Sequence, residues 1–334
     1  MKAAVHHRYG GPDVIEIADL PTPRPGKGEV LVRIVTTTVS SADWRLRSLV
    51  VPRGFGLPVR LMFGWNRPRQ PVLGTELAGV VTAAGPGVTG FAPGDEVVAF
   101  VGAALACHAE FRVVKETAAM IRKPPALTWE EAGAMSFGGA TALGFLRDKI
   151  RLRAGERLLV TGASGAVGSA GVQIGRAMGA HVTGLARREN HDLLRSLGAD
   201  EVRDFRDWAA SDDPLGFDAI LDVAGKAGAA DLGRTLRPGG RLGQVVGDLP
   251  SLLKAPFLRL GEGRRVIGGT IPERREDLAE LAMLAGQGLY RPVVGSVTPL
   301  DRIALAHRIT DSGHKRGSAV VRVAADPAAA ETAQ

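Results

Sequence analysis

Three glycines between a strand and a helix are the clearest chemical signal in this sequence. Gly162, Gly165 and Gly168 follow the strand pattern that starts at Glu156 and precede a helical pattern that extends to about residue 180. Glycines let a phosphate group approach backbone N–H groups closely, and the helix dipole favours its negative charge. The spacing and context therefore predict a bound dinucleotide. We expect its pyrophosphate to be wrapped by Gly162, Ala163, Ser164, Gly165, Ala166, Val167 and Gly168.

The end of the next strand decides which nicotinamide nucleotide is preferred. Enzymes that select NAD usually carry an acidic residue there, about twenty residues after the glycines, to bind the ribose hydroxyls. This sequence has Ala186, Arg187 and Arg188 instead. Guanidinium groups can hold a 2′-phosphate through paired hydrogen bonds. The sequence therefore predicts NADPH, and the alternative is a pair of solvated arginines, one of them neutralised by Glu189.

Composition limits the other kinds of chemistry. The 334 residues contain one cysteine, Cys107, which excludes internal disulfides and zinc sites with two or more thiolates. We assign Cys107 no role, and we interpret His6, His7, His307 and His314 as core or surface residues rather than metal ligands. The net charge of +7 comes from scattered arginines, which favours a generally anion-friendly surface over a specific nucleic-acid partner. No apolar run is long enough to span a membrane and no secretory signal is present, so we expect a cytoplasmic protein.

Two kinds of pattern divide the chain into a β-rich part and an α/β part. Residues 1–125 show short β-rich runs broken by Gly and Pro, and residues 126–272 alternate strands with helices. The second part predicts a doubly wound parallel sheet of six strands, with the strands at 156–162, 181–186, 201–205, 217–225, 240–247 and 264–271. We expect residues 273–334 to return to the first domain and complete it. Ligands bind at the carboxyl ends of such strands, so we expect further cofactor contacts from Val223, Ala224, Gly225, Val246 and Gly247.

Ordered motifs along nearly the whole chain carry a family resemblance. They include PVLGTELAGVV (71–81), LTWEEAGAMSFGGATAL (127–143), GASGAVGS (162–169), LRPGG (236–240) and TPLDRIALAHRITDSGHKRGSAVVRV (298–323). In these stretches the chain resembles the medium-chain dehydrogenase/reductase superfamily, and within it the zinc-free quinone oxidoreductase-like branch. The resemblance implies a GroES-like β domain, a Rossmann domain and a cleft between them. It also implies that Thr141 lies near the cofactor.

The resemblance also bears on metal and substrate. Zinc-dependent members of the superfamily have a Cys before the first helix and a His in a Gly-His-Glu motif, where this chain has Ser40 and Thr75. The usual set of three zinc ligands is then missing, so we expect a reaction without zinc. Without a Lewis acid, an acceptor that spreads the developing charge is favoured over a simple ketone. We expect Ser40 or Thr75 to donate a hydrogen bond to its carbonyl, with substrate contacts from Asp43, Trp44, Arg47, Phe63 and Trp65.

Residues 48–71 have a composition of their own, with large apolar side chains among arginines. An ordinary packed loop is the first interpretation, a lid over an apolar substrate the second, and an amphipathic contact with an anionic membrane the third. Membrane contact is therefore not our main expectation.

The function that these patterns favour is hydride transfer from NADPH to a quinone or an α,β-unsaturated ketone, with no zinc and no assigned general acid. A zinc-free NADP-dependent alcohol or aldehyde dehydrogenase is the alternative enzyme. A nucleotide-binding protein with an RNA-binding role is the alternative from another class. Residues 264–271 resemble the edge strand through which the family joins two Rossmann sheets, so we also expect a homodimer.

Overall fold

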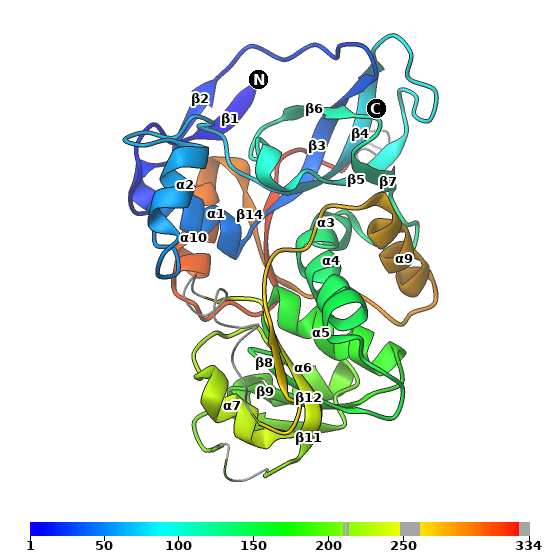
Figure 1. Ribbon diagram of the computed structural model, residues 1–334. Coiled ribbons are helices and arrows are strands. Elements are labelled where there is room, and N and C mark those ends of the chain that lie inside the picture. The colour runs from blue at the N-terminus through cyan, green and yellow to red at the C-terminus, as the bar shows by residue number, and fades with distance from the viewer. Residues whose placement is uncertain (210, 212–213, 248–260, 327–334) are drawn as a thin grey trace.

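The structure is a computed structural model that describes residues 1–209, 211, 214–247 and 261–326. Two lobes are stacked along the long axis of the molecule (Figure 1). The upper lobe is rich in β-strands, and the lower lobe holds a parallel sheet flanked by helices. Among the described residues, no helix is both long enough and apolar enough to span a bilayer.

The upper lobe is built on a seven-stranded sheet and a two-stranded hairpin. The sheet has the order β14-β15-β3-β4-β5-β7, with β6 paired to β3, and β1 pairs with β2. Their bounds are β1 Lys2–Val5, β2 Glu16–Asp19, β3 Glu29–Val39, β4 Glu76–Ala84, β5 Glu96–Phe100, β6 Phe111–Lys115 and β7 Ala119–Arg122. Between β3 and β4 lie the helices α1 (Ser41–Ser48) and α2 (Gly56–Phe63). Apolar residues of β3, β4 and β5 alternate between two buried cores, one on each face of the sheet.

The lower lobe holds the six-stranded parallel sheet that the sequence predicts. Its order is β10-β9-β8-β11-β12-β13, which is the doubly wound arrangement. The bounds are β8 Arg157–Thr161, β9 His181–Ala186, β10 Glu201–Asp204, β11 Phe217–Asp222, β12 Leu236–Gln244 and β13 Arg265–Ile267. Strand β12 starts four residues earlier than expected because Leu236 already pairs with Phe217, before a shift in register. The helices are α5 Ala166–Ala177, α6 His191–Ser196 and α7 Ala229–Thr235.

Helices between the lobes connect the two sheets. Residues 127–150 contain α3 (Trp129–Gly133), α4 (Ser136–Gly144) and a π-helical turn at Phe145–Ile150. Helix α4 packs on α5 so closely that a Cβ at Gly138 would lie 2.7 Å from the carbonyl oxygen of Ala166. The described core continues from these helices into the parallel sheet.

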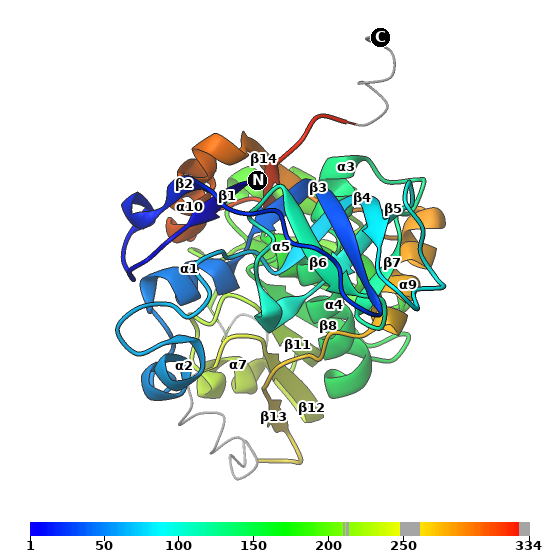
Figure 2. The same ribbon diagram turned by 90° about the horizontal axis from the view of Figure 1, so that it is seen from above.

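The end of the chain runs back to the upper lobe (Figures 1 and 2). After α9 (Arg275–Gly286), strand β14 (Val294–Pro299), helix α10 (Ile303–Asp311) and strand β15 (Ser318–Arg322) follow. Strand β15 pairs antiparallel with β3, with Ala319 opposite Val39. The residues just before β15 therefore lie beside the end of β3, where α1 begins.

Candidate functional site

The glycine turn, defined here as Gly162–Gly168, connects β8 to α5 through a backbone path that larger residues would block. Gly162 has a φ of +58°, which favours glycine. A Cβ at Gly168 would lie 2.2 Å from the carbonyl oxygen of Gly162, so the turn can close only without a side chain there. Gly165 is different, because a Cβ there would meet only the Gly162 oxygen, at 3.5 Å. The space outside Gly165 is therefore open.

The first turn of α5 faces this open space with free backbone donors. The helix begins after Gly165, and no side chain caps it. The first N–H groups of an α-helix have no partner within the helix, and together with the dipole they attract an anion. A pyrophosphate group therefore fits the residues that the sequence assigned to it.

A second turn of the sheet lies against the glycine turn. The Thr161 hydroxyl donates to Asp222 Oδ1 (2.6 Å) and accepts hydrogen bonds from the backbone of Val223 and Ala224. A Cβ on Gly225, whose φ is +61°, would lie 3.1 Å from that of Val246. The predicted cofactor residues at the ends of β11 and β12 are thus brought together beside the end of β8.

The end of β9, where the sequence predicts that the ribose binds, is surrounded by further charged residues besides Arg187 and Arg188. Ala186, at the end of β9, is paired in register with Asp204, at the end of β10. Both oxygens of Asp204 are engaged, since Oδ1 accepts from Arg206 and Oδ2 from Arg206 and the backbone N–H of Arg188. Hydrogen bonds from Arg206 hold the pKa of Asp204 well below its usual range. Arg187 lies 3.6 Å from Glu189, and Arg188 lies 3.4 Å from Asp207.

A cavity of about 420 Å³, called here the cleft pocket, lies between the lobes. The upper lobe contributes Trp44 and Arg45 from α1 and the chain that follows it, and the lower lobe contributes the ends of β11 and β12 with the start of α7. Its lining is Trp44, Arg45, Val50, Val51, Pro52, Arg53, Gly225, Ala227, Gly228, Ala229, Gln244, Val246 and Gly247. Of the predicted substrate residues, Trp44 lies here, whereas Phe63 and Trp65 do not line this pocket. Thr141, the remaining predicted cofactor residue, donates its hydroxyl to the carbonyl of Phe137 on α4.

Ser40 and Asp43 hold the start of α1. Ser40 donates its hydroxyl to Asp43 Oδ2 (2.6 Å), and the backbone N–H groups of the two residues complete a capping box. Asp43 Oδ1 also accepts from the backbone of Gly74 (2.8 Å). Both side chains are buried and bonded to each other. These bonds support the start of the helix, and the Ser40 hydroxyl proton is donated to Asp43 rather than toward a substrate.

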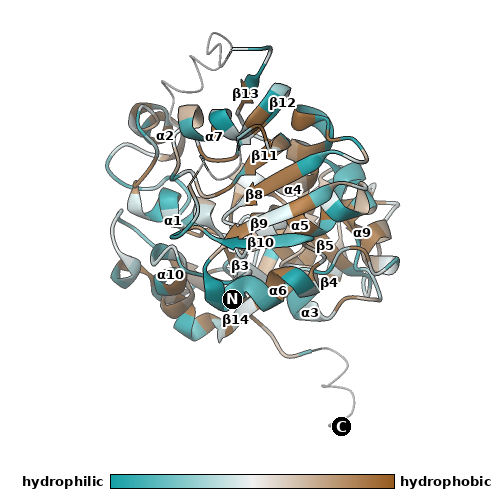
Figure 3. Ribbon diagram, turned by 90° about the horizontal axis from the view of Figure 1, so that it is seen from below, coloured by the Kyte–Doolittle hydropathy of each residue, from teal (hydrophilic) through white to brown (hydrophobic). Residues whose placement is uncertain are grey.

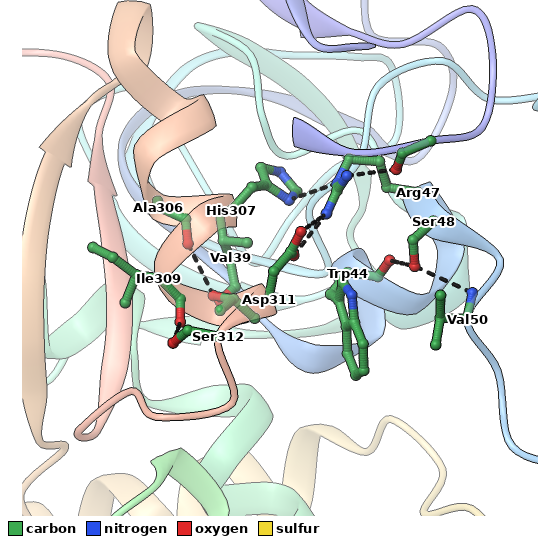
Figure 4. Close-up of polar contacts among 12 residues, drawn as sticks. Val39, Trp44, Arg47, Ser48, Val50, Ala306, His307, Ile309, Asp311 and Ser312 are labelled. Carbon is green, nitrogen blue, oxygen red and sulfur yellow. Dashed lines mark hydrogen bonds and ion pairs between the residues drawn. The ribbon is translucent and has the colours of Figure 1, made fainter. Parts of the chain in front are cut away.

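Arg47 points away from Trp44, the residue of α1 that lines the cleft pocket (Figure 4). Its guanidinium group is fully buried and donates to both oxygens of Asp311, to the carbonyl of Gly10 and to His307 Nδ1. The expectation that Arg47 contacts substrate is therefore replaced by a structural role, because these partners connect α1 to α10 and to the N-terminal hairpin. Burial, with His108 and Arg47 nearby, holds the pKa of His307 well below its usual value.

Thr75 and Glu76 stand at the start of β4. The Thr75 hydroxyl is buried and has no hydrogen-bond partner among the described residues, so it remains available to a ligand. Glu76, which the sequence did not single out, accepts from the Thr38 hydroxyl and from the backbone N–H groups of Ser136 and Phe137 at the start of α4. Burial raises the pKa of Glu76 to about 7. This carboxyl group ties the β sheet of the upper lobe to the helix that packs on α5.

Lys315 is a second residue that the sequence did not single out. Its ammonium group donates to the carbonyl oxygen of Val39 (3.3 Å), the residue before Ser40. Burial lowers the pKa of Lys315 to about 8, against the opposing influence of Asp43 and Glu76. Two residues later, the N–H of Gly317 donates to the carbonyl oxygen of Ser164 in the glycine turn (2.7 Å). The loop thus places a cation where the glycine turn meets the end of β3.

The residues at the two positions where zinc-dependent members carry Cys and His are not typical zinc ligands. Ser40 is engaged with Asp43, and Thr75 offers a neutral hydroxyl where a zinc-dependent enzyme has histidine. Cys107 is fully buried, and burial raises the pKa of its thiol. Within the described ranges, no group of three or more His, Cys, Asp and Glu side chains is arranged to hold a metal ion.

Comparisons with known proteins agree with this architecture. Residues 26–160 match the alcohol dehydrogenase GroES-like domain family, and residues 197–321 match a family described as zinc-binding dehydrogenase. The chloroplastic quinone oxidoreductase of Triphysaria versicolor is 30% identical over 333 residues, which cover 96% of this chain and 98% of that protein.

Two solved structures extend the comparison. The quinone oxidoreductase from Coxiella burnetii superimposes with a TM-score of 0.85 over 97% of this chain and 99% of that one, and at 23% identity it shows the shared fold. A mycobacterial protein solved in complex with NADPH is 26% identical, with a TM-score of 0.81 over 97% of this chain and 100% of that one. The full-length matches and the two-lobed site lead to one conclusion. The chain belongs to the medium-chain dehydrogenase/reductase superfamily of oxidoreductases and resembles its quinone oxidoreductases over nearly the whole length.

Proposed function

We propose that this chain is a cytoplasmic, zinc-independent oxidoreductase that uses NADPH to reduce a quinone or an α,β-unsaturated ketone. The observation that carries the proposal is the cleft pocket, which joins Trp44 and the chain after α1 to the strand ends beside the glycine turn. NADPH, when bound, supplies the hydride. Residues of the two lobes then position the acceptor beside it and exclude water, which is the main protein contribution to such a reaction.

Charge at the ribose end supports NADPH over NADH. The carboxylate of Asp204 is held by Arg206 and the backbone of Arg188, so its oxygens are not free to accept from ribose hydroxyls. Arg188 is largely exposed and pairs only loosely with Asp207, at 3.4 Å. A 2′-phosphate offers a guanidinium group a stronger, doubly charged partner than an exposed carboxylate.

Thr75 and Lys315 are the residues that we assign to the negative charge of the acceptor. A buried hydroxyl without a partner is costly and gains a hydrogen bond when a carbonyl enters. When hydride reaches a carbon of the acceptor, an electron pair moves to the conjugated carbonyl oxygen. The Lys315 ammonium stabilises that oxygen and passes it a proton, and the resulting amine regains a proton from solvent. A pKa of about 8 suits this task, because the lysine is then protonated at neutral pH and still acidic.

The proposed reaction is tested by following NADPH absorbance with a panel of quinones, enones, aldehydes and ketones, with NADH in parallel. We expect quinones or enones to consume NADPH and simple ketones to fail, before and after treatment with a chelator. Lys315→Met should lower kcat/KM and abolish the fall in rate above about pH 8, whereas Lys315→Arg should keep a cation and move that fall to higher pH. Turnover of none of these acceptors, or loss of activity with removal of a metal, would refute the proposal.

An alcohol or aldehyde dehydrogenase is the second candidate, because the matched families are described as alcohol and zinc-binding dehydrogenases. It predicts oxidation of an alcohol by NADP⁺ and reduction of unconjugated aldehydes at comparable rates. The same panel separates the two candidates.

We also propose that the enzyme is a homodimer joined through β13. This strand pairs with β12 on one side and lies at the end of the described sheet, so its other edge offers unpaired backbone groups. Light scattering at micromolar concentration should give twice the mass of one chain, and a monomer would contradict the proposal.

A further inference from the structure

The surface around α2 exposes an unusual number of large apolar side chains. Leu57, Leu61 and Met62 on the helix are 58%, 59% and 64% exposed, and Val50 and Trp65 beside it are 56% and 54% exposed. These are five of the eleven exposed large hydrophobic residues in the part of the chain that the structure describes. Single exposed apolar residues are ordinary, but a cluster marks a contact surface. No residue of α2 is buried, so this segment is not an ordinary packed loop.

Hydrogen bonds fix the shape of this surface. The Tyr9 hydroxyl donates to the carbonyl of Gly64 (2.7 Å), and the N–H of Arg69 donates to the carbonyl of Phe63 (2.7 Å). A Cβ at Gly64, where φ is +127°, would lie 2.0 Å from the carbonyl oxygen of Arg67. The turn after α2 is therefore a specific structure that holds the helix at the rim of the upper lobe (Figures 2 and 3).

The charge of the same surface has one sign. Arg53, Arg60, Arg67 and Arg69 lie among the apolar residues, and no aspartate or glutamate occurs between residues 44 and 75. Arg60 and Arg69 donate to carbonyl groups of Trp65 and Met62, and none of the four arginines forms an ion pair with another described residue. Within the part of the chain that the structure describes, their positive charges are thus left without an ion-pair partner.

We propose that this surface, called here the α2 face (Val50, Arg53, Leu57, Arg60, Leu61, Met62, Trp65, Arg67 and Arg69), docks on an anionic lipid membrane. Apolar side chains enter the boundary between headgroups and acyl chains, and arginines bind the headgroup phosphates. A second copy of this chain would fit the α2 face less well. A two-fold contact of the face with itself would place arginines opposite arginines, and the segment has no carboxylate to pair with them. A lid is also a poorer occupant, because Leu57, Leu61 and Met62 do not line the cleft pocket.

Membrane docking would also deepen the proposed function, on which this step rests. Val50 and Arg53 belong to both the α2 face and the lining of the cleft pocket. Docking would therefore hold one wall of the pocket at the lipid surface. An apolar quinone or enone partitions into that lipid, so the class of substrate that this geometry favours is one with a long apolar chain.

Sedimentation of the full chain with vesicles tests the docking without reference to activity. We expect binding to vesicles that contain phosphatidylglycerol, decreasing with salt, and little binding to phosphatidylcholine alone. Replacing Leu57, Leu61 and Met62 together by serine should abolish sedimentation. The double variant Arg60→Gln and Arg67→Gln should weaken binding by about 25-fold, at about five-fold for each charge.

The matched control replaces three exposed apolar residues elsewhere, Met283, Leu289 and Leu305, by serine and should bind as the wild type does. Circular dichroism and reduction of a water-soluble quinone check that each variant is folded. The docking proposal is overturned if no vesicle is bound, if the control loses as much binding as the α2 variant, or if the α2 variant instead changes the mass measured by ultracentrifugation. If the wild type sediments with vesicles but reduces no acceptor, the proposed function fails and the docking stands.

Discussion

Gly165 and Gly168 offer a matched pair of alanine substitutions that separates cofactor binding from folding. Both glycines belong to the glycine turn, but their surroundings differ. At Gly165 the backbone is extended, with φ −79° and ψ 177°, which alanine adopts without strain. Its Cβ would touch only the Gly162 oxygen, at 3.5 Å. At Gly168 the Cβ would lie 2.2 Å from that same oxygen and 2.7 Å from the Cα of Ala163.

The expected magnitudes follow from these distances. The methyl group of Gly165→Ala would occupy the space outside the turn and keep a phosphate from one or two N–H groups. A hydrogen bond to a charged group contributes about 1.5 to 3 kcal/mol, so the loss is about 3 kcal/mol, or on the order of 100-fold in Kd for NADPH. Without cofactor, Gly165→Ala should change the free energy of unfolding by less than about 1 kcal/mol. Gly168→Ala should cost about 1 to 3 kcal/mol of stability, because the turn must shift.

Fluorescence titration with NADPH and urea unfolding of the cofactor-free protein measure the two quantities. Gly165→Ala should be stable and bind poorly, and Gly168→Ala should be measurably less stable before any ligand is added. A wild-type Kd for Gly165→Ala would show that no phosphate group lies against this turn. A large loss of stability in the same variant would show that the space outside Gly165 is filled by protein.

Three further predictions concern charged groups. Glu76→Gln should remove a pH dependence of the free energy of unfolding. Folding raises the pKa of Glu76 from 4.5 to about 7, so the wild type should lose about 3 kcal/mol of stability as the pH rises through that range. Urea unfolding at several pH values should show no such loss in the variant. Replacing Arg187 and Arg188 by alanine should raise KM for NADPH at least ten-fold and leave that for NADH unchanged, and equal effects on both would exclude a 2′-phosphate contact. Arg47→Met should lower the free energy of unfolding by about 3 to 5 kcal/mol, measured in urea, because Asp311 loses its bonded partner; a loss below 1 kcal/mol would contradict the role given to this ion pair.

The sequence predicts the parts of this protein that local patterns encode. The glycine turn needs three residues within seven positions, and the central strands β8 and β11 of the parallel sheet contain short apolar runs. Assignments that depended on where a side chain points, rather than on where the residue stands in the sequence, were less accurate. Ser40 and Asp43 have the spacing of a capping box, S-x-x-D, and that local signal could have shown that their side chains bond to each other.

The roles that sequence analysis missed depend on contacts across long separations. Arg47 meets Asp311, 264 positions away, and nothing in either neighbourhood indicates the pair. Glu76 reaches Ser136 and Phe137 only because the lobes fold against each other. Lys315 lies in a glycine-flanked loop that reads as an exposed turn. Its place near the site follows from the pairing of β15 with β3, which brings the loop back to residue 39.

Two sets of polar contacts hold the lobes in a fixed relation beside the cleft. On one side, Glu76 bonds to the start of α4, which packs against the first turn of α5. On the other, Gly317 bonds to Ser164 within the glycine turn. Both contacts end beside the glycine turn, so they fix the part of the chain to which we assign the cofactor. The chain after α1, Val50–Arg53, forms another wall of the pocket and is joined to neither contact. Differences in acceptor between related enzymes should therefore arise in this segment, where side chains can change without moving the cofactor.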